Sequence, residues 1–212
     1  MLLSGGIDSA TCLCLAKRKG YRVMALTFEY HGIAESELRA ARRVARSVGV
    51  EEHRLVRLPD IREAGALRAS RLRGMPPTYI PLRNSIFYSI AAGVAEEIGA
   101  SRIIGGHNRD DLNVFRDTGR EFFGKLQGAL WAASPRLGKD RIRLVRPLQR
   151  LSKPEVIRRA AKIRVPLELT WSCHRDGMAH CWRCKGCASR TEAFKRAGVP
   201  DPLKRPRIGE NS

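Results

Sequence analysis

The residues Ser4-Gly5-Gly6-Ile7-Asp8-Ser9 follow a short apolar segment and open a stretch with helical spacing. A glycine turn between a strand and a helix lets backbone N–H groups point at an anion, and the helix dipole adds positive potential there. No Gly-Lys-Ser/Thr follows, so the loop is not a Walker motif, and a loop without that lysine suits a pyrophosphate group. We predict an anion site in which Ser4 and Ser9 donate hydroxyl groups. The alternative is a plain tight turn in which Asp8 caps the helix.

Apolar segments typical of buried strands alternate with segments of helical periodicity along the rest of the chain. Strands are expected at residues 1–3, 21–28, 52–58, 101–105 and 142–145, and helices at 8–19, 36–48, 84–98, 121–132, 152–162 and 188–197. The alternation predicts an α/β fold with a doubly wound parallel sheet. We expect an α/β domain over residues 1–167, followed at 168–212 by a metal-binding knuckle, a short helix and a basic tail.

The composition is that of a globular protein with an unusual excess of basic residues. The 212 residues include 40 Lys and Arg against 21 Asp and Glu, a formal charge of +19. This charge favours a polyanionic partner, nucleic acid first, although solvent-exposed basic helix faces such as residues 39–46 give the same total. No apolar run reaches the length of a membrane span and no signal peptide is evident, so a cytoplasmic location is expected. The first strand begins almost at the glycine loop, so we expect Met1 to be a late start or a trimmed end.

Four of the six cysteines are clustered and form a C-x7-C-x2-C-x2-C pattern: Cys173, Cys181, Cys184 and Cys187. A tight cluster in a chain without secretory features indicates a metal site rather than a disulfide framework. Four thiolates complete the tetrahedral shell of a structural Zn²⁺, with an iron–sulfur cluster as the alternative. The other two, Cys12 and Cys14, fit small buried apolar positions in the first helix.

Two groups of motifs resemble known protein families. The hexapeptide at residues 4–9 resembles the PP-motif of the ATP pyrophosphatases, or PP-loop enzymes. Thr170-Trp171-Ser172-Cys173, the cysteine cluster, and residues 190–194 and 197–202 resemble the C-terminus of the QueC family, the 7-cyano-7-deazaguanine (preQ0) synthases. Residues 78–84 and 151–153 resemble further parts of that family, so the resemblance covers nearly the whole chain.

This resemblance implies an ATP-dependent carbon–nitrogen ligase that acts in deazapurine synthesis for queuosine-type nucleosides. The enzyme would adenylate the carboxylate of 7-carboxy-7-deazaguanine with release of pyrophosphate, and ammonia would displace AMP to give an amide. A second adenylation and loss of AMP would then give the nitrile. Mg²⁺ would assist ATP, Zn²⁺ would be structural, and the family alone implies a homodimer.

The resemblance also implies roles for particular residues. ATP would be bound by residues of the loop and of one later motif: Leu3, Ser4, Gly5, Gly6, Ile7, Asp8, Ser9, Arg83 and Asn84. Asp8 and Lys153 would be catalytic, although Lys153 also fits an exposed first-turn lysine and Asn84 also fits a simple helix cap. The second substrate would be contacted by three residues of a later segment: Asp117, Arg120 and Glu121.

The chain departs from the family pattern in two segments, and the second of them is expected to line the second-substrate pocket. In residues 30–38 the Glu-Leu of the family is kept at Glu37-Leu38, but its Gln-x-His is not matched. Residues 112–116 differ from its Tyr-Ser-Gly-Tyr-Pro, whereas Asp117, Glu121 and Phe122 keep their spacing and Arg120 is displaced by one place. A QueC-like enzyme that joins a deazaguanine base to another amine, even one on a protein, is therefore an alternative. Another is a tRNA-modifying PP-loop enzyme, because residues 106–111 resemble a motif of such enzymes and the charge suits RNA. A zinc-bearing nucleic-acid binder is the non-enzyme alternative.

Overall fold

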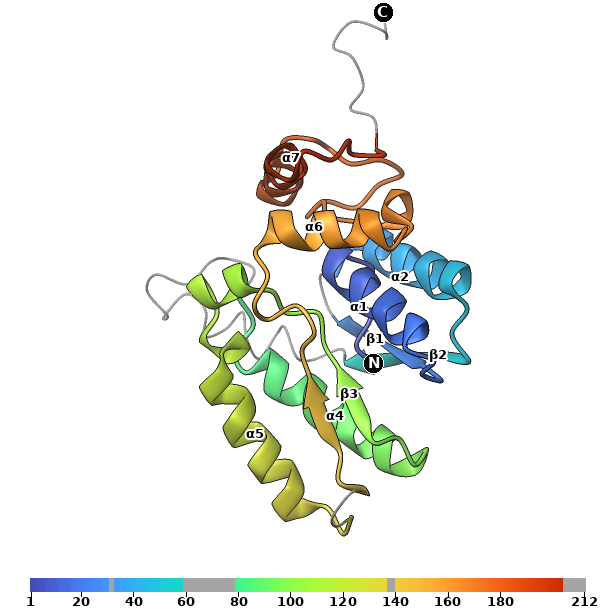
Figure 1. Cartoon of the computed structure of the whole chain (residues 1–212), viewed down its shortest axis with the longest axis vertical. Coiled ribbons are helices and arrows are strands. Elements are labelled where there is room, and N and C mark those ends of the chain that lie inside the picture. The colour runs from blue at the N-terminus through green and yellow to red at the C-terminus, as the bar shows by residue number, and fades with distance from the viewer. Residues whose placement is uncertain (31–32, 59–78, 137–139, 204–212) are drawn as a thin grey trace, which may run out of the picture.

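The computed structural model describes residues 1–30, 33–58, 79–136 and 140–203 of the chain (Figure 1). Residues 31–32, Thr78 and the basic tail from Lys204 onward, all considered above, lie outside the described residues.

Helices and strands alternate along the described chain, as the sequence predicts. The helices are α1 (Ile7–Arg18), α2 (Glu35–Val48), α4 (Arg83–Glu97), α5 (Arg120–Ala133), α6 (Lys153–Lys162) and α7 (Lys185–Ala197). The strands are β1 (Met24–Tyr30), β2 (Glu52–Leu58), β3 (Arg102–Ile104) and β4 (Arg143–Val145), and short 3₁₀ helices lie at η1 (Arg109–Asn113), η2 (Arg116–Thr118) and η4 (Leu167–Leu169). The predicted α/β class is confirmed. Within these ranges, no helix has both the length and the apolar character needed to cross a membrane.

The strands form two parallel pairs that the N-terminal residues bring together. Strand β1 runs parallel to β2, and β3 runs parallel to β4. Between the pairs, the Leu3 N–H donates to Leu26 O at 2.8 Å and the Leu2 N–H donates to Ile104 O at 2.9 Å. Residues 1–3 therefore lie between β1 and β3 and lead the chain directly into the glycine loop.

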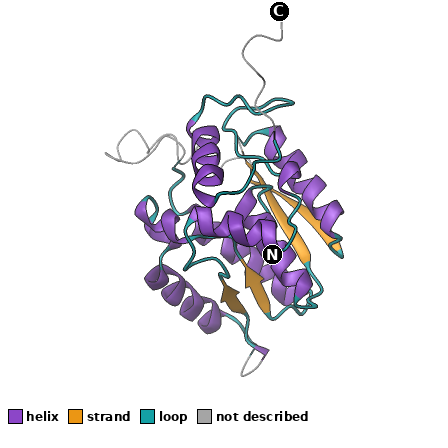
Figure 2. Cartoon of the chain, turned by 45° about the horizontal axis from the view of Figure 1, so that its top comes forward, coloured by secondary structure: helices purple, strands orange, loops and turns teal. Residues whose placement is uncertain are grey.

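Two hydrophobic cores accompany these strands. One core joins apolar side chains of α1, α2, α6 and α7, with Leu13 and Val44 fully buried in it. Cys12 and Cys14 are buried in the same core, as predicted. The other core joins α4 and α5 to β1 and β3 around the buried ring of Tyr88. The helices thus divide between two cores, and Figure 2 shows them packed around the strands.

Two predicted boundaries are wrong by three residues, each for a local reason. The strand expected from Tyr21 begins only at Met24, because the Tyr21 N–H is still bound to a carbonyl at the end of α1. The last helix begins at Lys185 rather than at Ala188, because the sulfur of Cys184 accepts a backbone N–H and caps it. The cysteine-bearing segment therefore leads directly into α7.

Candidate functional site

The glycine loop turns sharply against α2 before α1 begins. Gly5 has a φ of 80°, in the left-handed region that favours glycine. A Cβ at this position would lie 2.6 Å from the Glu37 carbonyl oxygen and 2.7 Å from the Ala41 nitrogen, which are both backbone atoms. Gly6 then caps α1 without a side-chain hydrogen bond. No capping side chain therefore occupies the first backbone N–H groups of α1, which can face an anion.

Ser4 and Ser9 face each other across this loop. Their hydroxyl oxygens lie 3.2 Å apart, and the Ser4 N–H donates to Ser9 Oγ at 3.2 Å. The Ser9 hydroxyl also donates to Gly6 O at 3.0 Å. The loop thus presents two hydroxyl groups beside its backbone amides.

Asp8 and Lys153 meet beside the loop although they are 145 positions apart in the sequence. The Lys153 ammonium donates to Asp8 Oδ2, and the two side chains are only 24% and 18% exposed. The Lys153 backbone N–H donates to Asp110 Oδ2 at 2.8 Å, which fixes the start of α6. Within the described residues, the buried atom Asp8 Oδ1 has no hydrogen-bond partner. A buried carboxylate oxygen without a donor fits a cation.

The turn after β3 closes over the start of α1. A Cβ on Gly106 would lie 2.8 Å from the Ser9 nitrogen and 2.9 Å from the carbonyl carbon of Asp8. Two residues later, the Asn108 N–H donates to Asp111 Oδ2 at 2.9 Å in a capping box that begins η1. Burial, together with the negative charge of Asp8, raises the pKa of Asp111 to about 6. Two interacting carboxylates therefore lie at this end of the loop.

A cleft of about 330 Å³ opens between the glycine loop, the ends of β1 and β3, and the start of α4. Ser4 and Ser9 line its loop end. Its walls are aromatic: Phe28 and Phe87 stack with ring centroids 4.0 Å apart and an interplanar angle of 3°, and Phe115 lines the cleft as well. The cleft combines a loop whose backbone N–H groups can face an anion with flat apolar walls, the features that a nucleotide or a purine-like base would need.

Glu37 and Arg83 add opposite charges to this cleft. Burial raises the pKa of Glu37 to about 7, against the opposing influence of the Arg83 guanidinium. Among the described residues, no hydrogen-bond donor reaches the Glu37 carboxylate. The cleft therefore contains an acid that changes protonation state near neutral pH.

His107 lines the same cleft from the turn after β3. Its Nε2 lies 3.0 Å from the hydroxyl oxygen of the buried Tyr88. Burial lowers the pKa of His107 to about 4, with the cationic Arg146 contributing. Gly105 leaves room for the pair, since a Cβ there would lie 1.6 Å from the Tyr88 hydroxyl. His107 is therefore neutral at physiological pH and offers the cleft a hydrogen-bonding ring without charge.

Five of the nine predicted ATP-binding residues line the cleft, whereas Gly5, Gly6 and Asp8 of the loop do not. Leu3 lines it beside the serines, whereas Ile7 is buried in the core beneath the loop. Arg83 and Asn84, from the first turn of α4, both line the opposite wall.

The predicted second-substrate residues are not gathered at this cleft. Asp117 contributes its backbone oxygen, which accepts the Asn84 side-chain amide at 3.0 Å. Arg120 and Glu121 are exposed in the first turn of α5, where Glu121 pairs with Lys125 at 2.7 Å. None of the three lines the cleft, and contact with substrate stays a prediction for each of them.

Sequence reasoning missed Glu37, His107 and Asp111 as lining residues of the cleft. A signal for Asp111 existed in the motif at residues 106–111. A signal for Glu37 existed in its match to the Glu-Leu of the family motif, although helical periodicity alone does not distinguish a buried acid from an exposed one. His107 is recognisable only from its packing against Tyr88.

The four predicted cysteine ligands converge in the structure. Their sulfur atoms all lie within 4.8 Å of one another, and the Cys173–Cys184 and Cys181–Cys187 pairs are 3.8 and 4.0 Å apart. A tetrahedral Zn²⁺ with bonds of about 2.3 Å would place its sulfur ligands about 3.8 Å apart. Backbone N–H groups point at these sulfurs, including that of Cys187, which donates to Cys184 Sγ at 3.4 Å. The donor set and its spacing fit one metal ion.

Short contacts attach the cysteine-bearing segment to the glycine loop. The Trp171 N–H donates to Gly5 O at 2.9 Å. The Ser36 hydroxyl, on the helix against which the loop packs, donates to Gly177 O at 2.7 Å. The cysteine-bearing segment therefore supports the glycine loop on the side away from the cleft.

Comparison with known proteins identifies the family. Residues 1–198 match the family model described as Queuosine biosynthesis protein QueC. The chain belongs to the QueC family. The 7-cyano-7-deazaguanine synthase of Thermoplasma volcanium is 35% identical to this QueC-family chain, over 96% of this chain and 89% of that protein. The protein of the same name from Legionella pneumophila (strain Paris) is 38% identical, over 96% of this chain and 95% of that protein.

Solved structures share the fold of this QueC-family chain at lower sequence identity. NMN synthetase from Francisella tularensis has a TM-score of 0.52 at 17% identity, over 94% of this chain and 76% of that one. The U34-tRNA thiolase NcsA from Methanococcus maripaludis, with its 4Fe–4S cluster, has a TM-score of 0.52 at 20% identity, over 78% of this chain and 56% of that one. These likenesses bear on the α/β fold alone.

Proposed function

We propose that this chain is an ATP-dependent ligase that converts 7-carboxy-7-deazaguanine and ammonia into 7-cyano-7-deazaguanine, with release of AMP and pyrophosphate. The observation that carries the proposal is the cleft in which Ser4 and Ser9 of the glycine loop meet the aromatic walls Phe28 and Phe87. The loop offers an anion site, and the walls accept a planar base. The name that the curated relatives share supports the same substrate and product.

In this proposal the loop binds the phosphate groups of ATP. The amides at the start of α1 and the hydroxyls of Ser4 and Ser9 would hold the departing pyrophosphate. Lys153 would stabilise the charge that develops on the α-phosphate, since its ammonium is already held beside the loop by Asp8. Asp8 Oδ1, together with Asp111, would hold Mg²⁺, which offsets phosphate charge when bound.

The reaction would use two rounds of adenylation. An oxygen of the substrate carboxylate attacks the α-phosphorus of ATP, the bond to the bridging oxygen breaks, and pyrophosphate leaves. Ammonia then attacks the acyl carbon and loses a proton as AMP leaves, which gives the amide. In the second round the amide oxygen is adenylated in the same way, and loss of AMP and both amide protons leaves the nitrile. Each adenylation builds negative charge beside the loop amides and Lys153, which would lower its barrier.

Glu37 would recognise the base. The six-membered ring of a deazaguanine carries two adjacent donors on one edge, the N1–H and the 2-amino group, which match the two oxygens of a carboxylate. Asp111 also lines the cleft, but its oxygens accept hydrogen bonds from Asn108. Ionised Glu37 is the form that accepts two donors, so base affinity should rise with pH through the Glu37 pKa of about 7.

The cysteine cluster would hold a structural Zn²⁺. Sulfur spacings of 3.8 and 4.0 Å match a single tetrahedral ion. In a 4Fe–4S cluster each thiolate binds a different iron, so the sulfurs would need to lie farther apart. Four protein ligands would leave the ion no open coordination position. Its role would therefore be to hold Cys173 and α7 in place.

Several architectural features also belong to this proposal. Residues 1–3 would act as the central strand that unites the two pairs into one doubly wound parallel sheet, because they bind both Leu26 and Ile104. A division into domains 1–167 and 168–212 stays a prediction, since α7 packs into the same core as α1. The homodimer and the cytoplasmic location also stay predictions.

Incubation of the purified protein with ATP, ammonia and 7-carboxy-7-deazaguanine, followed by mass spectrometry, tests the proposal. We expect the mass of the nitrile and two AMP for each nitrile formed. No nitrile should form when ammonia is omitted, and Lys153→Met should abolish it while leaving the folded state intact by circular dichroism. ATP turnover on another carboxylate without nitrile, or attachment of the base to a protein, would contradict the proposal.

A further inference from the structure

A separate cavity of about 350 Å³ lies between the end of α1, strands β3 and β4, and residues 146–151. It shares no lining residue with the active-site cleft. Four exposed basic side chains from different parts of the chain line it: Lys19, Arg102, Arg150 and Arg159. Among the residues that the structure describes, no Asp or Glu lines the cavity. We call it the basic groove.

The protein itself does not neutralise the basic groove. Across the described ranges, none of these four exposed cations pairs with a carboxylate, nor does the half-buried Arg146 that also lines the groove. The nearby Lys17, by contrast, pairs with Glu51 at 2.9 Å. In the parallel register of β3 and β4, Arg102 lies directly opposite the exposed Arg143. Like charges in such cross-strand positions are destabilising. The chain thus maintains a concentration of positive charge at a cost to its own stability.

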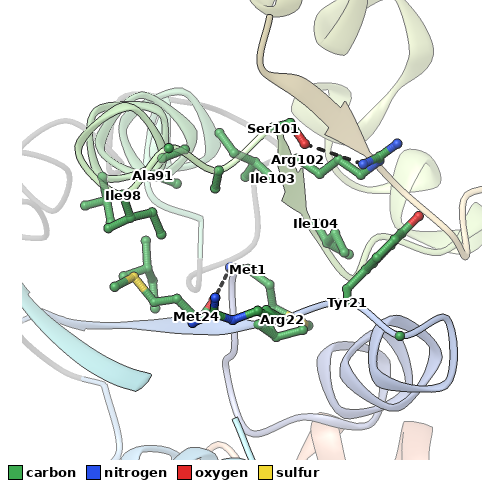
Figure 3. Close-up of a pocket in the computed structure, with 17 residues that line it drawn as sticks. Met1, Tyr21, Arg22, Met24, Ala91, Ile98, Ser101, Arg102, Ile103 and Ile104 are labelled. Carbon is green, nitrogen blue, oxygen red and sulfur yellow. Dashed lines mark hydrogen bonds between the residues drawn. The ribbon is translucent and has the colours of Figure 1, made fainter. Parts of the chain in front are cut away.

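The basic groove also contains an aromatic ring. The Arg102 guanidinium lies 5.3 Å from the ring centroid of Tyr21, which is half-buried. Tyr21 and Arg102 also line the neighbouring cavity beside Met1, where both are labelled in Figure 3. Leu15 and Ala16 of α1 add an apolar floor to the groove. A ring and an arginine beside unpaired cations are the combination that binds a nucleobase and its phosphates.

We propose that the basic groove binds single-stranded nucleic acid. The phosphates lie on Lys19, Arg102, Arg150 and Arg159, and a base stacks against Tyr21. An acidic protein matches the charge but has no use for the ring and the apolar floor, so the observations favour nucleic acid. The proposal goes beyond the ligase activity, whose substrate and product are free bases, and it accounts for part of the formal charge of +19.

Fluorescence anisotropy of the full chain with a labelled single-stranded RNA of about 12 nucleotides tests the proposal. With four phosphate contacts, log K should fall against log salt with a slope of about −2.8, or about 50-fold between 50 and 200 mM salt. The triple variant Arg102→Ser, Arg150→Ser, Arg159→Ser should lower the slope to about −0.7, or about 3-fold over the same range.

A matched variant with the same loss of charge elsewhere serves as the control: Arg46→Ser, Lys195→Ser, Arg196→Ser. All three of its positions are exposed, and it should bind like the unmodified protein. Tyr21→Leu keeps an apolar side chain and should weaken RNA binding about 5-fold or more without changing the affinity for inorganic polyphosphate. Both triple variants should form AMP from ATP at the unmodified rate.

Four results would overturn the proposal. The first is an absence of salt-dependent RNA binding, and the second is an equal loss of RNA affinity in both triple variants. The third is equal affinity for RNA and for a poly-glutamate peptide, and the fourth is displacement of the RNA by saturating ATP. The first removes the ligand and the second shows that net charge alone is responsible. The third makes the partner an acidic protein, and the fourth places binding in the active-site cleft.

Discussion

Arg190 and Asp201 form an ion pair whose guanidinium is fully buried. The side chains are 0% and 15% exposed, and the two hydrogen bonds between them measure 2.7 and 2.8 Å. The same guanidinium donates to Thr170 Oγ1 at 2.9 Å and to Leu167 O at 3.2 Å. One side chain thereby joins α7, the C-terminal segment and the residues that lead into the metal cluster. Asp201→Asn removes the only full negative charge that any of these contacts supplies.

The size of the effect follows from the burial of Arg190. A fully buried charge that loses its partner costs about 3–5 kcal/mol of folding free energy. In a chain of this length, each kcal/mol lowers Tm by about 2–4 °C, so Asp201→Asn should lower it by about 6–20 °C. Glu97→Gln is the matched control, because it breaks an ion pair with Arg54 at 3.2 Å whose side chains are 61% and 34% exposed. That exposed pair should contribute about 0–1 kcal/mol.

Differential scanning calorimetry and urea unfolding of the purified variants provide the measurement. The double variant Arg190→Met, Asp201→Asn should be more stable than Asp201→Asn alone, because it leaves no buried charge without a partner. A fall in Tm after Asp201→Asn no larger than after Glu97→Gln would refute the reasoning. So would a double variant less stable than Asp201→Asn.

Further predictions concern the cleft, the loop and the metal. In the folded protein the pKa of His107 is lowered to about 4, whereas in the unfolded chain His107 takes up a proton below about pH 6.5. Between pH 6.5 and 4 the unmodified protein should therefore lose up to about 3 kcal/mol more of its free energy of unfolding than His107→Gln loses. Urea unfolding of both proteins at each pH measures this difference. Glu37→Gln should raise KM for 7-carboxy-7-deazaguanine about tenfold while leaving KM for ATP nearly unchanged, and should remove the gain in base affinity between pH 6 and 8; equal changes in both KM values would contradict its role. Gly106→Ala should raise KM for ATP about tenfold or more in steady-state assays, because the new methyl would lie 2.8 Å from a backbone nitrogen of α1. Cys184→Ser should reduce the metal content measured by mass spectrometry and lower Tm, and an unchanged metal content would rule out the four-sulfur site.

The loop and the metal ligands could be predicted because their information is local. The left-handed φ of Gly5 and the close approach of α2 require a residue without a side chain. A glycine in the sequence indicates such a position directly. The cysteine pattern likewise specifies its own ligand set within a short segment. Lys153 was different, since its contact with Asp8 joins distant positions and only the family resemblance placed it near the loop.

The second-substrate residues could not be placed in the same way. Residues 109–118 form the two short 3₁₀ helices, so the turn that reaches the cleft presents Thr118 while Arg120 and Glu121 point into solvent. Glu37, in contrast, does line the cleft, because packing of α2 against the loop buries this acid. The helical periodicity of α2 does not show that burial. Burial of single polar side chains depends on how elements meet, which periodicity does not report.

The hydrogen bond from the Trp171 N–H to Gly5 O has a consequence for the order in which the protein matures. The N–H donor of this bond belongs to a residue synthesised 166 positions after Gly5, so the glycine loop leaves the ribosome well before the group that binds its carbonyl oxygen. Contacts between residues so distant in sequence form late, because the intervening chain must first be ordered. The glycine loop therefore lacks this contact until the segment around Trp171 has been synthesised, and translation that stops before Trp171 yields a chain with the loop sequence but without the support behind it.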